Sequence, residues 1–261
     1  MIVVVTGTDT DVGKTVLTAA LAAGALDAGH SVAIYKPAQT GVEPGQGGDV
    51  HAIGSWLGNP PELTLSEGVR LNDPMAPVDA ALHAGGAAAA AALPTLADHL
   101  RRARALAKWH DVLLIEGAGG LLVSLTLAGE TIADIGRELG ARLVVATRPD
   151  LGTLNHTALT LEAAAARGFA RGVLVPGSFP ADPTALQQRN RSNLRALAGR
   201  HGWAWADGPP AGAVANPAHR QLILHAAGRK LAPVLVEAPL QVAPDTTDGR
   251  PRFVAEPARA G

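Results

Sequence analysis

The sequence predicts a single α/β domain with a mostly parallel β-sheet and helices on both of its faces. Three observations support this prediction. Short aliphatic runs alternate with helical patterns along most of the chain, as they do when parallel strands are joined by helices. The runs are continuously apolar, which is typical of strands buried on both faces. The length of 261 residues suits one large domain of this kind.

The individual elements are predicted from residue type and periodicity. Five short runs of β-branched or aliphatic residues predict strands: Ile2–Thr6, Val32–Tyr35, Val112–Glu116, Arg142–Ala146 and Gly172–Val175. Six longer segments between or after them have helical patterns: Val16–Ala28, Asp49–Leu57, Pro94–Lys108, Thr131–Leu139, Thr153–Arg167 and Pro183–Arg200. Two connections are expected to lack regular structure, the glycine-rich Gly41–Gly48 and the proline-containing Gly58–Asp79.

The end of the chain differs in composition from the rest. Residues 232–261 contain five prolines and show weak periodicity. We therefore expect a domain at residues 1–231 and a flexible tail at residues 232–261, with one short strand at Val234–Glu237.

The composition excludes several classes of function. Lys and Arg number 22 against 23 Asp and Glu, so the net charge of -1 gives no electrostatic reason to expect nucleic acid or an anionic membrane as a partner. The absence of cysteine excludes a disulfide framework, a cysteine nucleophile and an Fe–S cluster. No apolar run reaches the roughly 18 residues of a membrane span, and no signal-peptide pattern is visible. The expectation is a cytoplasmic protein.

The first predicted strand runs into a glycine-rich turn and then a helix. Residues 7–15 read GTDTDVGKT, and a strand, a turn ending in Gly-Lys-Thr and a helix together form the context of a phosphate-binding P-loop. Backbone N–H groups of such a turn, and the helix N-terminus, face the phosphates. We expect Lys14 to reach the β- and γ-phosphates and the Thr15 hydroxyl to ligate Mg²⁺. The predicted fold is therefore that of a P-loop NTPase, although five residues, not the standard four, separate Gly7 from Gly13.

Carboxylates at the same edge of the sheet are candidates for the metal site. Glu116 ends a predicted strand and precedes a glycine-rich stretch, so it should emerge at the carboxyl edge, where ligands of open α/β sheets bind. Mg²⁺ takes few protein ligands. Asp49 could join Thr15 and Glu116, or could serve only as the N-cap of its helix.

A second lysine follows the second predicted strand. Lys36 stands at the end of that strand, on the edge that holds the P-loop. Lysines at strand ends are usually solvated, but a neighbouring site for phosphate would give Lys36 a reason to turn inward.

Four motifs together resemble the dethiobiotin synthetase family. They are TGTDTDVGKT at residues 6–15, YKPAQTG at 35–41, IEGAGG at 115–120 and DLGTLNH at 150–156. The resemblance implies ATP-dependent ring closure of 7,8-diaminononanoate with CO₂ to dethiobiotin in biotin biosynthesis, with Mg²⁺ beside the nucleotide. In this reaction a carbamate of the diamine accepts the γ-phosphoryl group, and the second amine displaces phosphate. The resemblance also implies a homodimer.

The resemblance also assigns roles to residues. Lys36 and Lys14 would be catalytic, and Thr15, Asp49 and Glu116 would hold the metal. Thr40 would contact the substrate. The segment Gly152, Thr153, Leu154 and Asn155 would bind its carboxylate across the dimer interface, or would be only a helix cap beside a core leucine. The nucleotide would contact Asp11, Val12, Gly13, Lys14, Thr15, Val16, Asp49, Glu116, Gly117, Ala118, Gly119, Gly177, Ser178, Pro210, Ala211 and Gly212.

Two questions stay open at the level of sequence. Many relatives place an adenine-reading Asn where this chain has Gly177 and Ser178, so the preferred base is not determined. The main alternative function is a partitioning-type P-loop ATPase switch, but such proteins carry a signature Lys where this chain has Asp9. Amidotransferase-linked cobyrinate synthases need a cysteine, which is absent. A nonenzymatic nucleotide-binding relative would have no need for Lys36 together with Lys14.

Overall fold

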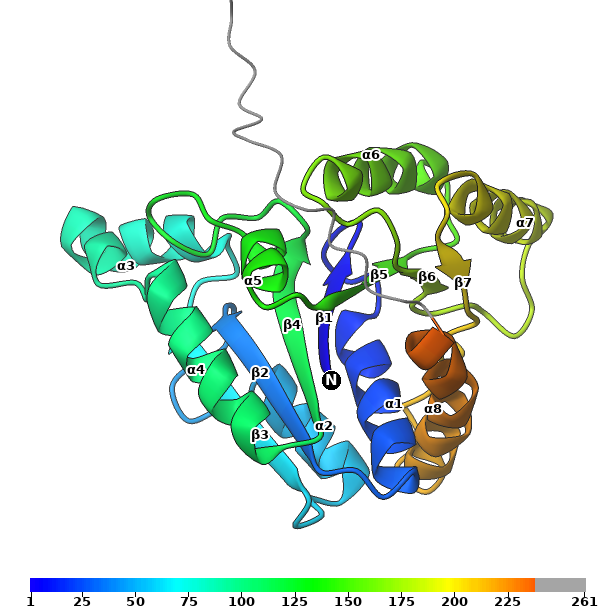
Figure 1. The fold of residues 1–261 in the computed structure, drawn as a ribbon, viewed down its shortest axis with the longest axis horizontal. Coiled ribbons are helices and arrows are strands. Elements are labelled where there is room, and N and C mark those ends of the chain that lie inside the picture. The colour runs from blue at the N-terminus through cyan, green and yellow to red at the C-terminus, as the bar shows by residue number, and fades with distance from the viewer. Residues whose placement is uncertain (238–261) are drawn as a thin grey trace, which may run out of the picture.

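Seven strands form one sheet in the computed structural model, which describes residues 1–237 and the side chains of residues 1–233. The strand order is β3-β2-β4-β1-β5-β6-β7 (Figure 1), and every pairing is parallel. The predicted fold class is therefore confirmed. The strands are β1 Ile2–Gly7, β2 Val32–Gln39, β3 Leu63–Arg70, β4 Val112–Gly120, β5 Arg142–Thr147, β6 Val173–Pro176 and β7 Ala204–Trp205.

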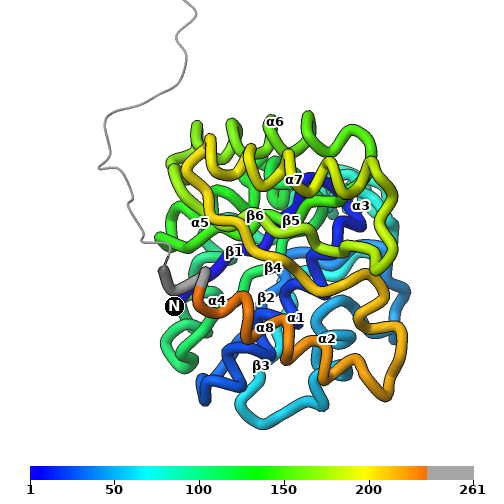
Figure 2. The backbone as a smooth tube through the Cα atoms, turned by 90° about the vertical axis from the view of Figure 1, so that its right-hand side faces the viewer, coloured from blue at the N-terminus to red at the C-terminus, as the bar shows by residue number. Residues whose placement is uncertain are grey.

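Helices cover both faces of the sheet. One apolar core lies between the sheet and α1 (Lys14–Asp27), α2 (Asp49–Leu57) and α8 (Arg220–Glu237), which lie next to one another in Figure 2. The other core lies beneath α4 (Leu96–Trp109), α5 (Ile132–Glu138), α6 (Thr153–Ala165) and α7 (Ala185–Arg200). Val3 and Val5 belong to the first core and Val4 to the second, because successive side chains of a strand point to opposite faces.

Two predictions about the elements are wrong. The segment Gly58–Asp79 is not irregular, because it contains β3 and the start of α3 (Pro77–Ala91). Strand β3 reads LTLSEGVR and is only partly buried, so it lacks the continuous apolar pattern of the inner strands. The short strand expected at Val234–Glu237 is instead the last turn of α8.

Helix α8 also bears on the predicted domain boundary. The boundary at Leu231 falls within this helix, which continues to Glu237. The flexible tail predicted from residue 232 lies mostly at residues 238–261, outside the described residues.

None of the helices within residues 1–237 is by itself both long and apolar enough to cross a membrane. Only α3 and α4 taken as a pair, across a bend of 90°, meet that criterion of length and composition.

Helix α8 packs against α1 through two glycines. A Cβ atom added to Gly228 would lie 2.2 Å from the Ala20 carbonyl oxygen and 2.5 Å from the Gly24 nitrogen. The close approach buries Leu224 and Leu231 in the first core. The sequence gives no sign of this packing because the two helices are far apart along the chain.

We predict that Gly228→Ala lowers the free energy of unfolding by about 2 kcal/mol, because the added methyl group overpacks the crossing of α1 and α8. Gly199→Ala in α7 is the matched control, since nothing lies within 4 Å of its added Cβ. The control should raise the free energy of unfolding by up to about 1 kcal/mol through helix propensity. Urea denaturation measures both, and equal effects would contradict the close packing.

His99 of α4 is a buried histidine. His99 Nδ1 lies 2.7 Å from the Tyr35 hydroxyl, and its Nε2 is buried without a hydrogen-bond partner. Burial is the main cause that lowers the pKa of His99 to about 4; Asp98 and Glu130 oppose the shift and Arg102 adds to it. Burial also raises the pKa of Tyr35 to about 12.

We therefore predict that the protein loses stability as the pH falls from about 6.5, the ordinary pKa of histidine, towards 4. In this window the unfolded chain binds more protons at His99 than the folded chain, so protonation favours unfolding. The loss should reach roughly 3 kcal/mol, from about 1.4 kcal/mol per pKa unit. Urea denaturation from pH 4 to 7 measures it, and His99→Phe should flatten the dependence. An equal slope in both proteins would rule out His99 as its source.

Candidate active site

The loop between β1 and α1 has the backbone of a phosphate-binding turn. Asp11 and Gly13 have positive φ values of 56° and 91°, and α1 starts directly after Gly13. Lys14 is buried and donates a hydrogen bond from Nζ to the Asp9 carbonyl oxygen, 2.8 Å away. Its side chain therefore folds back over the loop, and the N–H groups at the start of α1 are placed to bind an anion.

A second loop, after β6, supports the P-loop. A Cβ atom on Gly13 would lie 2.6 Å from the Gly177 carbonyl oxygen, and one on Gly177 would lie 1.9 Å from the Val12 carbonyl oxygen. Only glycine fits either position. Gly177, predicted from the resemblance to contact nucleotide, therefore lies against the P-loop backbone.

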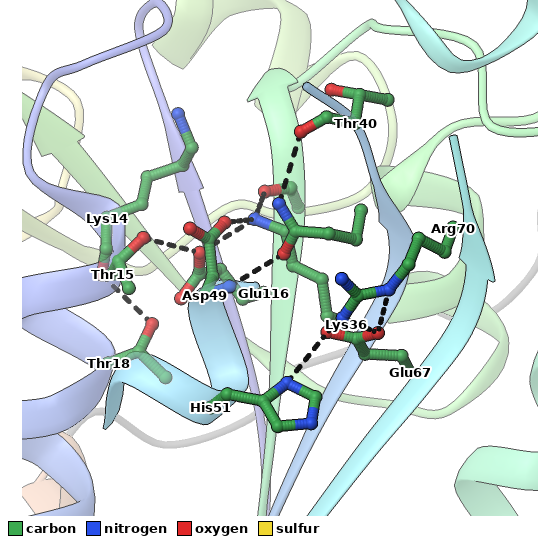
Figure 3. Close-up of polar contacts among 12 residues, drawn as sticks. Lys14, Thr15, Thr18, Lys36, Thr40, Asp49, His51, Glu67, Arg70 and Glu116 are labelled. Carbon is green, nitrogen blue, oxygen red and sulfur yellow. Dashed lines mark hydrogen bonds and ion pairs between the residues drawn. The ribbon is translucent and has the colours of Figure 1, made fainter. Parts of the chain in front are cut away.

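Lys36 is the fifth of the eight residues of β2, so it lies within the strand and not at its end as predicted, and its side chain lies between two carboxylates (Figure 3). Its Nζ atom is 2.6 Å from Asp49 Oδ2 and 2.8 Å from Glu116 Oε1. It also donates to the Gly117 carbonyl oxygen at 3.2 Å. Burial by itself lowers the pKa of Lys36, but Glu116 and Asp49 outweigh it and raise that pKa. The Lys36 side chain therefore remains a buried ammonium.

Thr15 and Lys14 connect the P-loop to this charged cluster. The Thr15 hydroxyl donates to Glu116 Oε1 at 2.9 Å, so the first turn of α1 touches the middle of β4, where Glu116 is the fifth of nine residues. Burial, together with the positive charge of Lys36, lowers the pKa of Lys14. The site thus holds two lysines whose charges affect one another, as we expect where negative phosphate oxygens bind.

Oxygen atoms in this cluster fit a divalent metal ion. Glu116 Oε2 is buried and has no hydrogen-bond partner, while Glu116 Oε1 accepts from the Thr15 hydroxyl and shares Lys36 with the Asp49 carboxylate. These are hard oxygen ligands, which suit Mg²⁺. Within residues 1–237 no three or more His, Cys, Asp or Glu side chains form a metal cluster. Two carboxylates and a hydroxyl match an ion that keeps several waters and phosphate oxygens as ligands.

A cleft of about 680 Å³ opens above this cluster. Ten residues predicted for the site line it: Asp11, Gly13, Lys14, Thr15, Val16, Lys36, Thr40, Asp49, Ala118 and Gly119. Sequence reasoning missed nine others, which are Thr10, Ala38, Gln39, Gly41, Pro74, Met75, Ala76, Pro77 and Val123. Pro74–Pro77 belong to the segment expected to be irregular, and only the fold brings this segment to the cleft.

Other predicted residues lie outside the lining of the cleft. Val12, Glu116 and Gly117 are buried beneath it. Ser178 is partly buried, while Pro210, Ala211 and Gly212 are exposed in a loop where Ala211 N–H donates to the Phe179 carbonyl oxygen at 2.9 Å. Asp49 is not an N-cap, because α2 has Gly48 at that position.

The residues at the start of α6 cap the N-terminus of that helix. Gly152 is the N-cap, with a φ of 89°. The Thr153 hydroxyl is buried and donates to the Arg148 carbonyl oxygen at 2.6 Å. Leu154 and Asn155 are exposed. In a single chain these residues do not meet the cleft.

The P-loop, the inward lysine and the buried carboxylate define a P-loop enzyme that uses a nucleoside triphosphate. A family model described as an AAA domain matches residues 2–200. An ATP-dependent dethiobiotin synthetase BioD of Rhodococcus jostii (strain RHA1) is 48% identical over 200 residues, covering 76% of this chain and 82% of that protein. The chain therefore belongs to the ATP-dependent dethiobiotin synthetase family and is an ATP-dependent ligase.

A further relative agrees with this membership, and a solved structure shares the fold. The synthetase of the same name from Mycobacterium leprae (strain Br4923) is 49% identical over 197 residues, covering 76% of this chain and 83% of its own. The MinC:MinD cell division protein complex of Aquifex aeolicus has a TM-score of 0.51 at 9% identity, covering 89% of this chain and 96% of its own. The fold is therefore shared with proteins of other function. Sequence identity, not the fold, separates this chain from the alternative of an ATPase switch. Membership of the family implies a divalent metal ion beside the nucleotide.

Proposed function

We infer that this chain closes the ureido ring of dethiobiotin, with 7,8-diaminononanoate, CO₂ and ATP as substrates, in biotin biosynthesis. The observation that carries this inference is the buried Lys36 ammonium, held 2.6 Å from Asp49 and 2.8 Å from Glu116 beside the P-loop. A nucleotide hydrolase with water as its only acceptor has no evident use for this second lysine. A carbamate, in contrast, brings a negative charge that needs a cation next to the phosphoryl group.

The residues of the cleft match the steps of this reaction. The Lys14 ammonium neutralises charge on the β- and γ-phosphates, and Lys36 orients the carbamate oxygen towards the γ-phosphorus. After phosphoryl transfer the second amine attacks the carbamic–phosphoric anhydride, and phosphate leaves as the ring closes. Because the nucleophile is an amine of the substrate, the chain contributes mainly positioning and charge stabilisation.

The remaining wall of the cleft suits the aliphatic part of the diamine. Pro74, Met75, Pro77 and Val123 line it with apolar surface, and the Thr40 hydroxyl lies at the same opening. A diamine with a long methylene chain can bury that chain on such a wall while its amines reach Lys36.

We propose Mg²⁺ as the metal, held by Thr15, Asp49 and Glu116. It would neutralise phosphate charge during transfer. The unpartnered Glu116 Oε2 supports this assignment.

An exposed apolar face supports a homodimer. Leu151, Leu154 and Leu159 on and before α6 are 80%, 36% and 57% exposed, and Leu122 after β4 is 48% exposed. Leu122 and Leu159 line one shallow depression. We propose that a second copy of the chain covers this face. Its α6 would bring residues 152–155 to the neighbouring cleft and supply the contact with the substrate carboxylate that the single chain lacks.

The biosynthetic role and the use of ATP support a cytoplasmic location.

One experiment tests the function and the open question of the base. Purified protein is incubated with 7,8-diaminononanoate, bicarbonate, Mg²⁺ and each of ATP, GTP, CTP and UTP. We expect phosphate release to require the diamine and to match the cyclic urea formed, detected by mass spectrometry. Phosphate release without the urea would contradict the proposal. Comparable rates with several triphosphates would show that the loop at Gly177 and Ser178 does not select adenine.

A further inference from the structure

Gln39 joins the end of β2 to the start of α2. Its side chain is 4% exposed, and its Oε1 atom accepts a hydrogen bond from the Asp49 N–H at 2.8 Å. Its Nε2 donates to the Thr40 carbonyl oxygen at 3.2 Å. The first N–H of α2 is thus satisfied by a side chain from a strand, because the N-cap is Gly48 and has no side chain to supply.

A second layer of polar groups supports this contact from β3. A Cβ atom on Gly48 would lie 2.7 Å from both Gln39 Oε1 and Glu67 Oε1, so both oxygens press against the backbone just before Asp49. Arg70 donates to both Glu67 oxygens, at 2.9 and 2.7 Å from Nη2. The same arginine donates from Nη1 to the Gln46 carbonyl oxygen at 2.6 Å. The end of the Gly41–Gly48 loop is therefore held on two sides.

Among the described residues, the hydrogen bonds of the Gln39 side chain reach the reactive cluster through Asp49. Asp49 Oδ2 contacts Lys36 at 2.6 Å, while Gln39 has no hydrogen bond to Lys36 or Glu116 among those of the described residues. The Asp49 side chain is 35% exposed, so few packing contacts fix its orientation. Its position therefore depends mainly on the anchored backbone. Figure 3 shows Glu67 between His51 and Arg70, beside the cluster of Lys36, Asp49 and Glu116.

We propose that Gln39 is a positioning residue for the metal site: it fixes the first residue of α2 so that the Asp49 carboxylate stays directed at Lys36 and the metal. This rests on the proposed function only in that Asp49 is a metal ligand. Loss of a group that orients a metal ligand typically weakens metal binding by about 10- to 100-fold.

The test measures Mn²⁺ binding by electron paramagnetic resonance, with a non-hydrolysable ATP analogue bound to the full chain. Gln39→Met keeps the length of the side chain but removes the acceptor, and we expect it to weaken Mn²⁺ binding by about tenfold. Gln39→Glu keeps an oxygen acceptor and should not weaken binding. Gln188→Met, an exposed position on α7, is the matched control and should bind Mn²⁺ like the wild type.

Gly48→Ala should weaken Mn²⁺ binding as Gln39→Met does, because its methyl group displaces the Gln39 side chain. The Gly48→Ala variant tests the hydrogen bond between Gln39 and the Asp49 N–H if Gln39→Met does not fold.

A double-mutant cycle separates positioning from general damage. In an Asp49→Asn background, Gln39→Met should cause little further loss of Mn²⁺ affinity, because the ligand it positions is already altered. Equal losses in both backgrounds, or no loss in the single variant, would overturn the proposal. An unchanged affinity in Asp49→Asn would also overturn it, because no ligand would remain to be positioned.

Measuring metal binding and turnover separately distinguishes a failure of the proposed function from a failure of the role proposed for Gln39. If the wild type binds Mn²⁺ and nucleotide but forms no cyclic urea, the proposed function fails and the role of Gln39 stands. If the wild type forms the urea but Gln39→Met binds Mn²⁺ normally, only the role of Gln39 fails. In steady-state assays Gln39→Met should raise the Mg²⁺ concentration for half-maximal rate more than it lowers kcat at saturating Mg²⁺.

Discussion

Lys36→Gln is expected to lower kcat for dethiobiotin formation by about a thousandfold, because removal of one preorganised group that stabilises developing charge costs 10² to 10³ and this group also orients the carbamate. Glutamine can still donate to Glu116 or Gly117, so the variant removes the charge while keeping a polar side chain in the cleft. Binding of nucleotide should persist, because Lys14 and the P-loop backbone are unchanged. Steady-state kinetics and binding of a fluorescent ATP analogue measure the two effects.

The Lys36 experiment needs a control for stability. Removing the ammonium takes from Glu116, which is fully buried, its ion pair with Lys36, and such a change can destabilise a protein. Thermal unfolding followed by circular dichroism therefore accompanies the kinetics. Lys108→Gln is the matched control, because the Lys108 ammonium lies over the exposed Trp109 ring at 5.3 Å. A kcat of Lys36→Gln within tenfold of the wild type would contradict the role given to Lys36.

Glu116→Gln should affect both the metal and the lysine. The carboxylate accepts from Thr15 and Lys36 through Oε1, and its Oε2 has no partner. Glutamine keeps the shape but carries no charge. We expect the Mg²⁺ concentration for half-maximal rate to rise more than about tenfold and kcat to fall about a hundredfold. Titration of Mg²⁺ at saturating nucleotide and diamine gives both values.

Glu162→Gln, at an exposed position on α6, is the control for the Glu116 variant. An unchanged Mg²⁺ requirement in Glu116→Gln would remove this residue from the metal site. In the double variant Glu116→Gln/Lys36→Gln, kcat should fall by less than the product of the two single fold-losses, because both substitutions disable the same cluster. Fully multiplicative losses would indicate that the two residues act separately.

The sequence predicted the inner part of the fold because that part depends on local pattern. Strands β1 and β4 each begin with four apolar residues, and parallel strands of this kind bring their carboxyl ends to one edge. This rule predicts that the P-loop, Lys36 and Glu116 lie close together. Strand β3 and helix α8 escaped prediction because their patterns are weak and their stability comes from distant neighbours.

What the sequence by itself determined is the class of fold, the phosphate-binding turn and the identity of the charged residues around it, since each is encoded within a few consecutive residues. The tertiary structure alone decided which groups touch. It placed Lys36 between Asp49 and Glu116, brought Pro74–Pro77 to the cleft and brought the Gln39 side chain to the first N–H group of α2. The physical reason is that a contact between residues distant in the chain depends on the register of the sheet and the packing of helices on it, which no local pattern records.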